Sequence, residues 1–184
     1  MKILLIRHGK PKISNPFLVN ANSFKDWLTQ YKNSSIMINK KLKSIEKRVK
    51  EYDRVYSSNL NRAKQSANLY SNNVEENKLF NEAEMPLYNF KIVIPLFLML
   101  FLSRFLWFLN FKIKVENIHR YRERVKIASN FLIDQANTNN SIALFGHKLF
   151  NIFVSRQLIK NGFKKNIINN SKYWYAVEYE KGDN

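Results

Sequence analysis

The chain has 184 residues, the length of one domain, and its 45% apolar and 24% charged residues are typical of a globular protein. It has no cysteine and only three histidines, which excludes disulfides, cysteine-based metal sites and a cysteine nucleophile, and argues against a histidine-rich metal site. The net charge of +17 suits an anionic partner, but abundant Lys and Asn also fit AT-rich codon usage, and the scattered lysines argue against a specific nucleic-acid partner.

The first third of the chain alternates short apolar runs with amphipathic segments. Lys2–Ile6 predicts a buried strand, and it is too short for the apolar region of a signal peptide, so we expect a cytoplasmic protein. The next predicted elements are a loop over 11–22, a helix capped by Ser23 and running through Tyr31, a helix over 39–52, a strand over 54–58 and a helix over 61–70.

An irregular segment over 79–86 precedes an intensely apolar stretch, Ile92–Leu109. Beyond it the spacing predicts a helix over 116–137, a strand over 141–145, a helix over 150–159 and a last strand over 174–179, which we place at an edge of the sheet. Strands that alternate with helices predict one α/β domain over 1–184. We expect a three-layer sandwich with a mostly parallel central sheet and helices on both faces.

Three predicted strands each lead to a side chain that can bind or attack phosphate. Arg7 and His8 follow the first, Arg62 lies a few residues after the second, and His147 follows the third. Because parallel strands end at the same edge of a sheet, these groups can converge. Guanidiniums offer paired donors to phosphate oxygens, and an imidazole can act as a nucleophile or carry a proton.

These motifs resemble those of the histidine phosphatase superfamily, also called the phosphoglycerate mutase-like family. Its Arg-His-Gly signature stands at 7–9, its Ser-x-Leu-x-Arg-Ala-x-x-Thr-Ala motif matches 58–67 with Ser66 in place of Thr, and its Gly-His motif stands at 146–147. The resemblance covers about 1–90 and 112–180. The Gly-x-Trp-Glu-Gly stretch of the family's mutases is absent, which makes mutase activity the less favoured one.

The resemblance implies a phosphatase that hydrolyses a phosphate monoester. His8 would become a phosphohistidine while Arg7, Arg62 and His147 hold the phosphoryl oxygens. A carboxylic acid, Glu82 or alternatively Glu84, would protonate the leaving group. Ser14 and Asn15 would line the phosphate pocket. We expect no metal and no cofactor, because two arginines and a histidine supply the positive charge.

The apolar stretch is as long as a short membrane span. A single crossing would put His8 and His147 on opposite sides of a bilayer, so we expect instead an apolar cap or insertion over about 83–118. Its outer face would contact a substrate tail, a second copy of the chain or a membrane surface. Two rival functions remain, which are a non-catalytic phospho-ligand binding protein on the same fold and a basic binder of nucleic acid or membrane surfaces.

Overall fold

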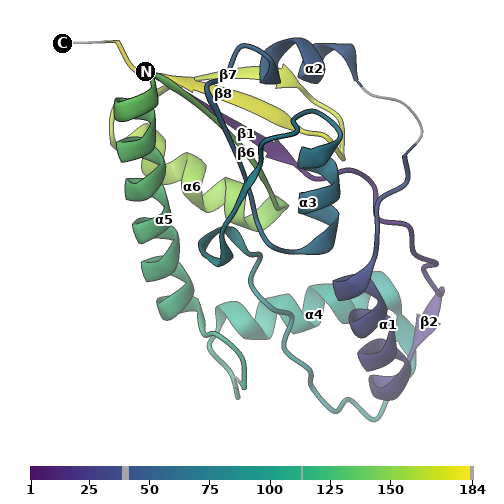
Figure 1. Ribbon diagram of the computed structural model, residues 1–184. Helices are drawn as coiled ribbons and strands as arrows, with labels where there is room; N and C mark the ends of the chain where they lie inside the picture. The colour runs from purple at the N-terminus through teal and green to yellow at the C-terminus, as the bar shows by residue number, and fades with distance from the viewer. Residues whose placement is uncertain (39–41, 113, 183–184) are drawn as a thin grey trace.

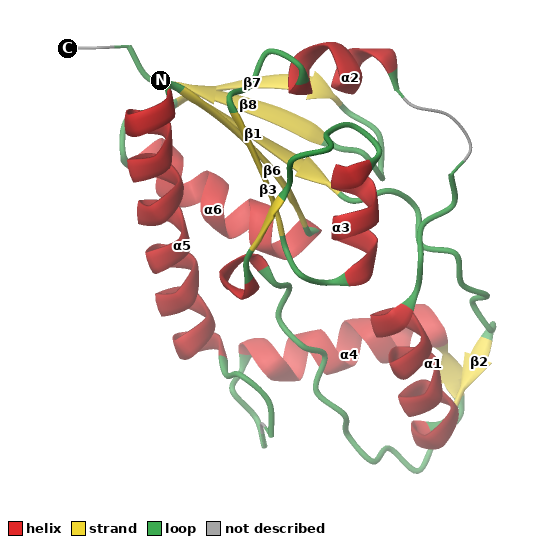
Figure 2. Ribbon diagram, viewed as in Figure 1, coloured by secondary structure: helices red, strands yellow, loops and turns green. Residues whose placement is uncertain are grey.

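A computed structural model describes residues 1–38, 42–112 and 114–182. At its centre is a six-stranded sheet with the order β4-β3-β6-β1-β8-β7 (Figures 1 and 2). The strands are β1 (Lys2–Arg7), β3 (Arg54–Ser57), β4 (Glu75–Glu76), β6 (Ser141–Gly146), β7 (Lys164–Asn169) and β8 (Ala176–Glu180). β4, β3, β6 and β1 run parallel, and the β7–β8 hairpin joins β1 through an antiparallel pairing. The sheet is mostly parallel, as predicted.

Alternate side chains of the central strand β1 belong to different cores. Ile3 and Leu5 pack with side chains of α5 (Ile118–Asn139) and α6 (Lys148–Lys160). Leu4 and Ile6 pack with side chains of α2 (Lys43–Val49) and α3 (Asn61–Asn68). A strand buried on both faces needs an unbroken apolar run, which explains the sequence of β1. The predicted three-layer sandwich is confirmed, with the helix pairs on opposite faces of the sheet (Figure 2).

The helix expected to start at Ser23 begins earlier. It is α1 (Ala21–Asn33), and Asn20 is its cap. The Asn20 side chain accepts a hydrogen bond from the Ser23 N–H at 2.9 Å, while the Ser23 hydroxyl accepts one from the Asn20 N–H at 2.9 Å. Ser23 is therefore the third helical residue, which completes a capping box with Asn20, and it is not the cap itself.

The predicted position of the C-terminal strand is wrong. β8 lies between β1 and β7, so it is an inner strand and not the predicted edge. The edge is β7, whose sequence Lys-Lys-Asn-Ile-Ile-Asn is mostly exposed and carries no strand-like alternation of apolar residues. Of the helix predicted over 39–52, residues 39–41 lie outside the described residues, and the described part forms α2.

A smaller lobe lies beside the sheet and has its own core (Figure 1). It is built from α1, α4 (Leu96–Phe108) and a two-stranded ribbon in which β2 (Leu18–Val19) pairs with β5 (Ile94–Pro95). Its buried members are Val19, Phe24, Trp27, Leu96 and Met99. The predicted cap over 83–118 thus packs against two segments from earlier in the chain. These are β2, which lies in the predicted loop over 11–22, and α1.

The apolar stretch forms α4, and the lobe buries only one side of it. Met99, Ser103 and Trp107 are buried, whereas Phe97, Phe101, Phe105 and Phe108 are 70%, 63%, 49% and 42% exposed. α4 has 13 residues. In the part of the chain that the structure describes, no helix has both the length and the apolar character that crossing a membrane requires.

Candidate active site

The carboxyl ends of β1, β6 and β3 lie next to one another, and each leads directly into the site. His8 follows β1, His147 follows β6, and Arg62 is the second residue of α3, which begins shortly after β3. All three side chains are buried. Arg62 Nε lies 3.3 Å from His8 Nε2, and the two imidazole ring centres are 5.2 Å apart. The structure thus brings together His8, Arg62 and His147, which come from three separate sequence motifs.

The backbone fixes the tautomer of His8. Its Nδ1 lies 2.7 Å from the carbonyl oxygen of Gly9. That oxygen can only accept, so Nδ1 carries the hydrogen and Nε2 keeps a lone pair. Burial, followed by the charges of Arg62 and Arg7, lowers the pKa of His8 to about 3. His8 is therefore neutral at physiological pH, which is the form that can attack phosphorus.

The glycine of Arg-His-Gly is required by close packing. A Cβ at Gly9 would overlap the indole ring of Trp174. The Gly9 N–H donates to the Ser66 hydroxyl at 2.9 Å, and that hydroxyl donates to the Arg62 carbonyl at 2.6 Å. Ser66, which stands where the family motif has Thr, thus ties the loop after β1 to the helix that carries Arg62.

His147 is held by a residue that the sequence argument did not assign. Its Nε2 lies 2.6 Å from the Ser58 hydroxyl, directly after β3, and its Nδ1 has no hydrogen-bond partner among the described residues. Burial, then the charge of Arg62, lowers the pKa of His147 well below its usual value. The signal that could have found Ser58 is its place as the first position of the Ser-x-Leu-x-Arg motif.

Arg7 is held by the loop before β8. Its Nη1 donates to the Lys172 carbonyl at 2.6 Å, and its guanidinium stacks 4.5 Å from the Tyr173 ring centre. The same ring lies 6.2 Å from the His8 ring. Tyr173 is a second site residue that the sequence argument missed, although the Tyr-Trp pair at 173–174 is an unusual signal this close to a strand.

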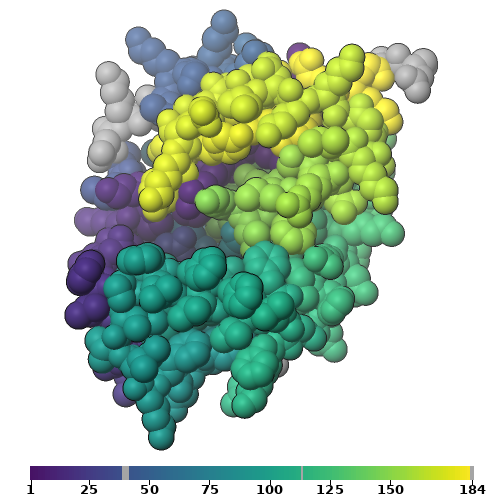
Figure 3. All heavy atoms as spheres, turned by 180° about the vertical axis from the view of Figure 1, so that it is seen from behind, coloured from purple at the N-terminus to yellow at the C-terminus, as the bar shows by residue number. Residues whose placement is uncertain are grey.

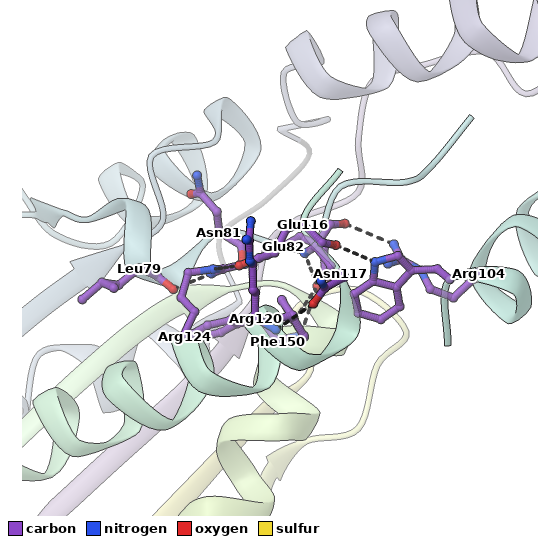
Figure 4. Close-up of polar contacts among 12 residues, drawn as sticks. Leu79, Asn81, Glu82, Arg104, Glu116, Asn117, Arg120, Arg124 and Phe150 are labelled. Carbon is purple, nitrogen blue, oxygen red and sulfur yellow. Dashed lines mark hydrogen bonds and ion pairs between the residues drawn. The ribbon is translucent and has the colours of Figure 1, made fainter. Parts of the chain in front are cut away.

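The two candidate acids occupy different places. Glu82 lies at the amino end of α6, just after His147, where it accepts hydrogen bonds from the Leu149 N–H at 2.9 Å and the Phe150 N–H at 3.2 Å (Figure 4). It also accepts one from the Tyr121 hydroxyl at 3.1 Å. Glu84 is exposed and pairs with Lys32 at 2.9 Å. Glu82 therefore lies beside the start of α6, the helix that follows His147, whereas Glu84 lies at the surface.

Arg124 on α5 holds the segment that leads to Glu82. It donates to the carbonyls of Leu79 and Asn81 at 2.7 and 2.9 Å, and it forms a two-point ion pair with Glu116 at 2.8 and 2.7 Å (Figure 4). Paired guanidinium–carboxylate contacts of this kind fix orientation as well as position. The Glu82 loop is therefore anchored to the long helix although it contains little secondary structure.

Several solved structures share this architecture. A phosphoserine phosphatase from Entamoeba histolytica matches with a TM-score of 0.60 and 15% identity, over 96% of this chain and 89% of that chain. A mycobacterial glucosyl-3-phosphoglycerate phosphatase matches at 0.53 and 12%, over 86% and 79%. The α-ribazole phosphatase from Shigella flexneri matches at 0.53 and 18%, over 86% and 80%. The chain has the phosphoglycerate mutase-like fold.

The resemblance inferred from the three motifs is thus confirmed at the level of the fold, which this chain shares with solved structures of three phosphatases. No family model matches the sequence, and no curated protein sequence does either. In this phosphoglycerate mutase-like fold the strand ends that carry the three motifs are neighbours in space. The short motifs at these ends can therefore be recognised although the overall sequence identity is low.

In this phosphoglycerate mutase-like chain a cleft of about 1450 Å³ separates the sheet from the small lobe. Arg62, Glu82 and Tyr173 line it from the site, and α1 and α4 line it from the lobe. Figure 3 shows the molecule hollowed between the teal region that contains α4 and the yellow C-terminal region. Asn15 is one of the residues that line the cleft, whereas Ser14 is not, and the Ser14 carbonyl accepts a hydrogen bond from the Trp27 indole at 3.0 Å.

The buried histidines predict sensitivity to acid. The folded state keeps His8 neutral far below pH 6.5, whereas the unfolded chain takes up a proton near that pH. The free energy of unfolding should therefore fall by up to about 1.4 kcal/mol per pH unit per buried histidine below pH 6.5. Urea unfolding of His8→Asn should be less pH-dependent than that of the wild type between pH 6.5 and 4.5. His119→Asn replaces an exposed histidine and should match the wild type, and identical slopes for all three would contradict the prediction.

Proposed function

We propose that the chain is a phosphatase that hydrolyses a small phosphate monoester through a phosphohistidine on His8. The observation that carries the proposal is a neutral, buried imidazole whose Nε2 faces the Arg62 guanidinium at 3.3 Å. A lone pair beside a fixed positive charge suits attack on an anionic phosphoryl group. The phosphoserine, glucosyl-3-phosphoglycerate and α-ribazole phosphatases that share the fold support a small phosphorylated substrate.

In the first step His8 Nε2 bonds to phosphorus and the bond from phosphorus to the alcohol oxygen breaks. Glu82 gives its proton to the leaving oxygen. In the second step water attacks the phosphohistidine, Glu82 takes a proton from that water, and phosphate leaves with Nε2 restored. Arg7, Arg62 and His147 hold the phosphoryl oxygens, with Asn15 at the cleft wall. A mutase cycle is the weaker alternative because the Gly-x-Trp-Glu-Gly stretch is absent.

Turnover of p-nitrophenyl phosphate in the presence of a strong chelator tests this function. We expect release of p-nitrophenolate to continue, since arginines and not a metal ion neutralise the phosphoryl charge in this mechanism. Phosphate binding without any turnover would favour the alternative, a non-catalytic phospho-ligand binding protein on the same fold.

Glu82→Gln should affect substrates in proportion to their need for a proton. An alkoxide is a poor leaving group and requires protonation, whereas p-nitrophenolate leaves readily without it. We expect kcat to fall by about 10²–10⁴-fold on an alkyl phosphate and far less on p-nitrophenyl phosphate. Glu84→Gln is the matched control and should be close to wild type on both. Equal losses on both substrates would remove Glu82 from the acid role.

We also propose that the outer face of α4 contacts an anionic lipid surface, as in a peripheral protein of the cytoplasm. Phe97, Phe101, Phe105 and Phe108 are exposed along this helix. Besides Arg104, which lines the cleft, the chain from 85 to 115 contains Lys91, Lys112 and Lys114 and no acidic residue. An apolar helix face in a positively charged surrounding is typical of helices that lie on anionic membranes.

The triple variant Phe101→Ser, Phe105→Ser and Phe108→Ser should reduce binding to phosphatidylserine vesicles by on the order of 10²-fold at low salt, because three rings no longer enter the lipid. Vesicle flotation measures this. Ile127→Ser, which replaces an exposed residue on α5, should bind as the wild type does. If the wild type does not bind vesicles but forms a dimer, and the triple variant does not form that dimer, the outer face of α4 contacts a second copy of the chain instead.

A further inference from the structure

The cleft is much larger than one phosphate group requires. Its volume of about 1450 Å³ exceeds the roughly 300–1,000 Å³ typical of sites for small ligands. In the proposed mechanism the phosphoryl group would take up only the end of the cleft that Arg62 lines, and Arg62 is 3% exposed. A second guanidinium, Arg104 of α4, also lines the cleft, with its Nη2 bonded to the Ala83 carbonyl at 3.2 Å. Most of the cleft must therefore receive the alcohol part of the substrate.

Further charged side chains line the cleft, among them Lys25 and Lys32 of α1 and Glu84, and its walls also carry many apolar side chains. The small lobe contributes Trp27 and Leu28 from α1 and Leu96, Phe97 and Leu100 from α4. The segment after Glu84 contributes three apolar side chains in succession, Met85, Pro86 and Leu87. Against these apolar side chains, the hydroxyls of a purely polar alcohol, such as a sugar, would lose water without compensation.

The apolar walls continue to the outside of the molecule. Phe17, Phe97 and Leu87 line the cleft and yet are 78%, 70% and 48% exposed. They therefore form the rim of the cleft. Phe97 also belongs to the exposed face of α4, so the inner wall and the outer face share a residue. Apolar side chains are therefore present both inside the cleft and at its rim, where a flexible apolar chain could contact them.

We propose that the substrate is the phosphate monoester of a long apolar alcohol, an amphiphile with a phosphate head and an alkyl or isoprenoid-like tail. The head contacts Arg62 and His8, and the tail lies between α1 and α4 and leaves over Phe97. This rests on the proposed phosphatase function, which it extends by naming the class of alcohol. The reaction is the hydrolysis described above, and its products are the free alcohol and inorganic phosphate.

The test uses n-alkyl phosphates from ethyl to octyl, below their micelle-forming concentrations and without any lipid. Each methylene buried in the cleft should raise kcat/KM by roughly threefold, so that hexyl phosphate exceeds ethyl phosphate by on the order of 10²-fold. Phe97→Ser and Leu100→Ser should lower the hexyl-to-ethyl ratio by roughly tenfold. Phe105→Ser is the matched control, since Phe105 is exposed on the same helix but does not line the cleft, and it should keep the wild-type ratio.

Equal kcat/KM values for ethyl, hexyl and octyl phosphate would overturn the inference while leaving the phosphatase function intact. A ratio lowered as much by Phe105→Ser as by Phe97→Ser would also overturn it, because the effect would then come from the outer face. If no phosphate ester is turned over, the phosphatase function fails. In that case, calorimetry measures the binding of ethyl and octyl phosphonate, which cannot be hydrolysed, and tests the preference for an apolar tail independently of turnover. Tighter binding of octyl phosphonate supports an apolar tail, and equal binding refutes it.

Discussion

His8→Ala is expected to lower kcat on every phosphate monoester by on the order of 10⁴-fold or more, the size of effect seen when an enzyme loses its nucleophile. The methyl group cannot bond to phosphorus, while Arg7, Arg62 and His147 remain in place. Inorganic phosphate and vanadate should therefore still bind. Steady-state kinetics and equilibrium binding on the same sample separate the two effects.

A direct measurement accompanies this variant. Rapid quenching of the wild type with a radiolabelled substrate should give a protein-bound phosphoryl group that is stable in base and lost in acid, as expected for phosphohistidine. His8→Ala should give none. If His8→Ala retained most of the wild-type activity, or carried the same label, the nucleophile would have to be another residue.

Arg62→Ala should lower kcat/KM by about 10²–10³-fold, because one guanidinium that faces the phosphoryl oxygens in the transition state is lost. Arg62→Lys should restore only part of this, since an ammonium group lacks the planar pair of donors. The exposed Arg156 of α6 provides the control, and Arg156→Ala should behave as the wild type. A wild-type rate for Arg62→Ala would mean that this side chain does not contact the transferred group.

The same variant should also change the pH profile. After burial, the charge of Arg62 is the largest influence that lowers the pKa of His8. Its removal raises that pKa, so more of His8 is protonated and inactive in mild acid. The acidic limb of kcat/KM in Arg62→Ala should therefore lie at higher pH than in the wild type, and part of the lowering should persist because His8 is still buried.

The sequence predicted best what lies at the ends of buried strands. β1 and β6 are short, mainly apolar runs and β3 is a short, mostly buried strand, and a polar motif follows each of them. Their parallel arrangement brings the strand ends together, so the motif order alone could assign His8, Arg62 and His147 to one site. The edge strand β7 was missed because most of its residues are exposed, so its sequence does not show the alternation of apolar and polar residues that indicates a strand.

Contacts between distant segments were beyond sequence reasoning. Nothing in the spacing links Ser58 to His147 or Tyr173 to Arg7, since these pairs meet only after the sheet has formed. The lobe core likewise joins Phe24 to Met99 across most of the first half of the chain. For the same reason the different surroundings of Glu82 and Glu84 could not be read from the sequence, because they depend on the position of α6.

The pairing of β1 with β6 and β8 has a consequence for the chain during its synthesis. Lys2–Arg7 is made before both of the strands that flank it, since these come after residue 140. At about 5–20 residues per second, the ribosome needs roughly ten seconds to make the segment between. Throughout that interval an apolar strand with two unpaired edges is available to other chains. Nascent chains halted before Ser141 should therefore bind chaperones or aggregate, and those extended beyond Glu180 should escape both fates.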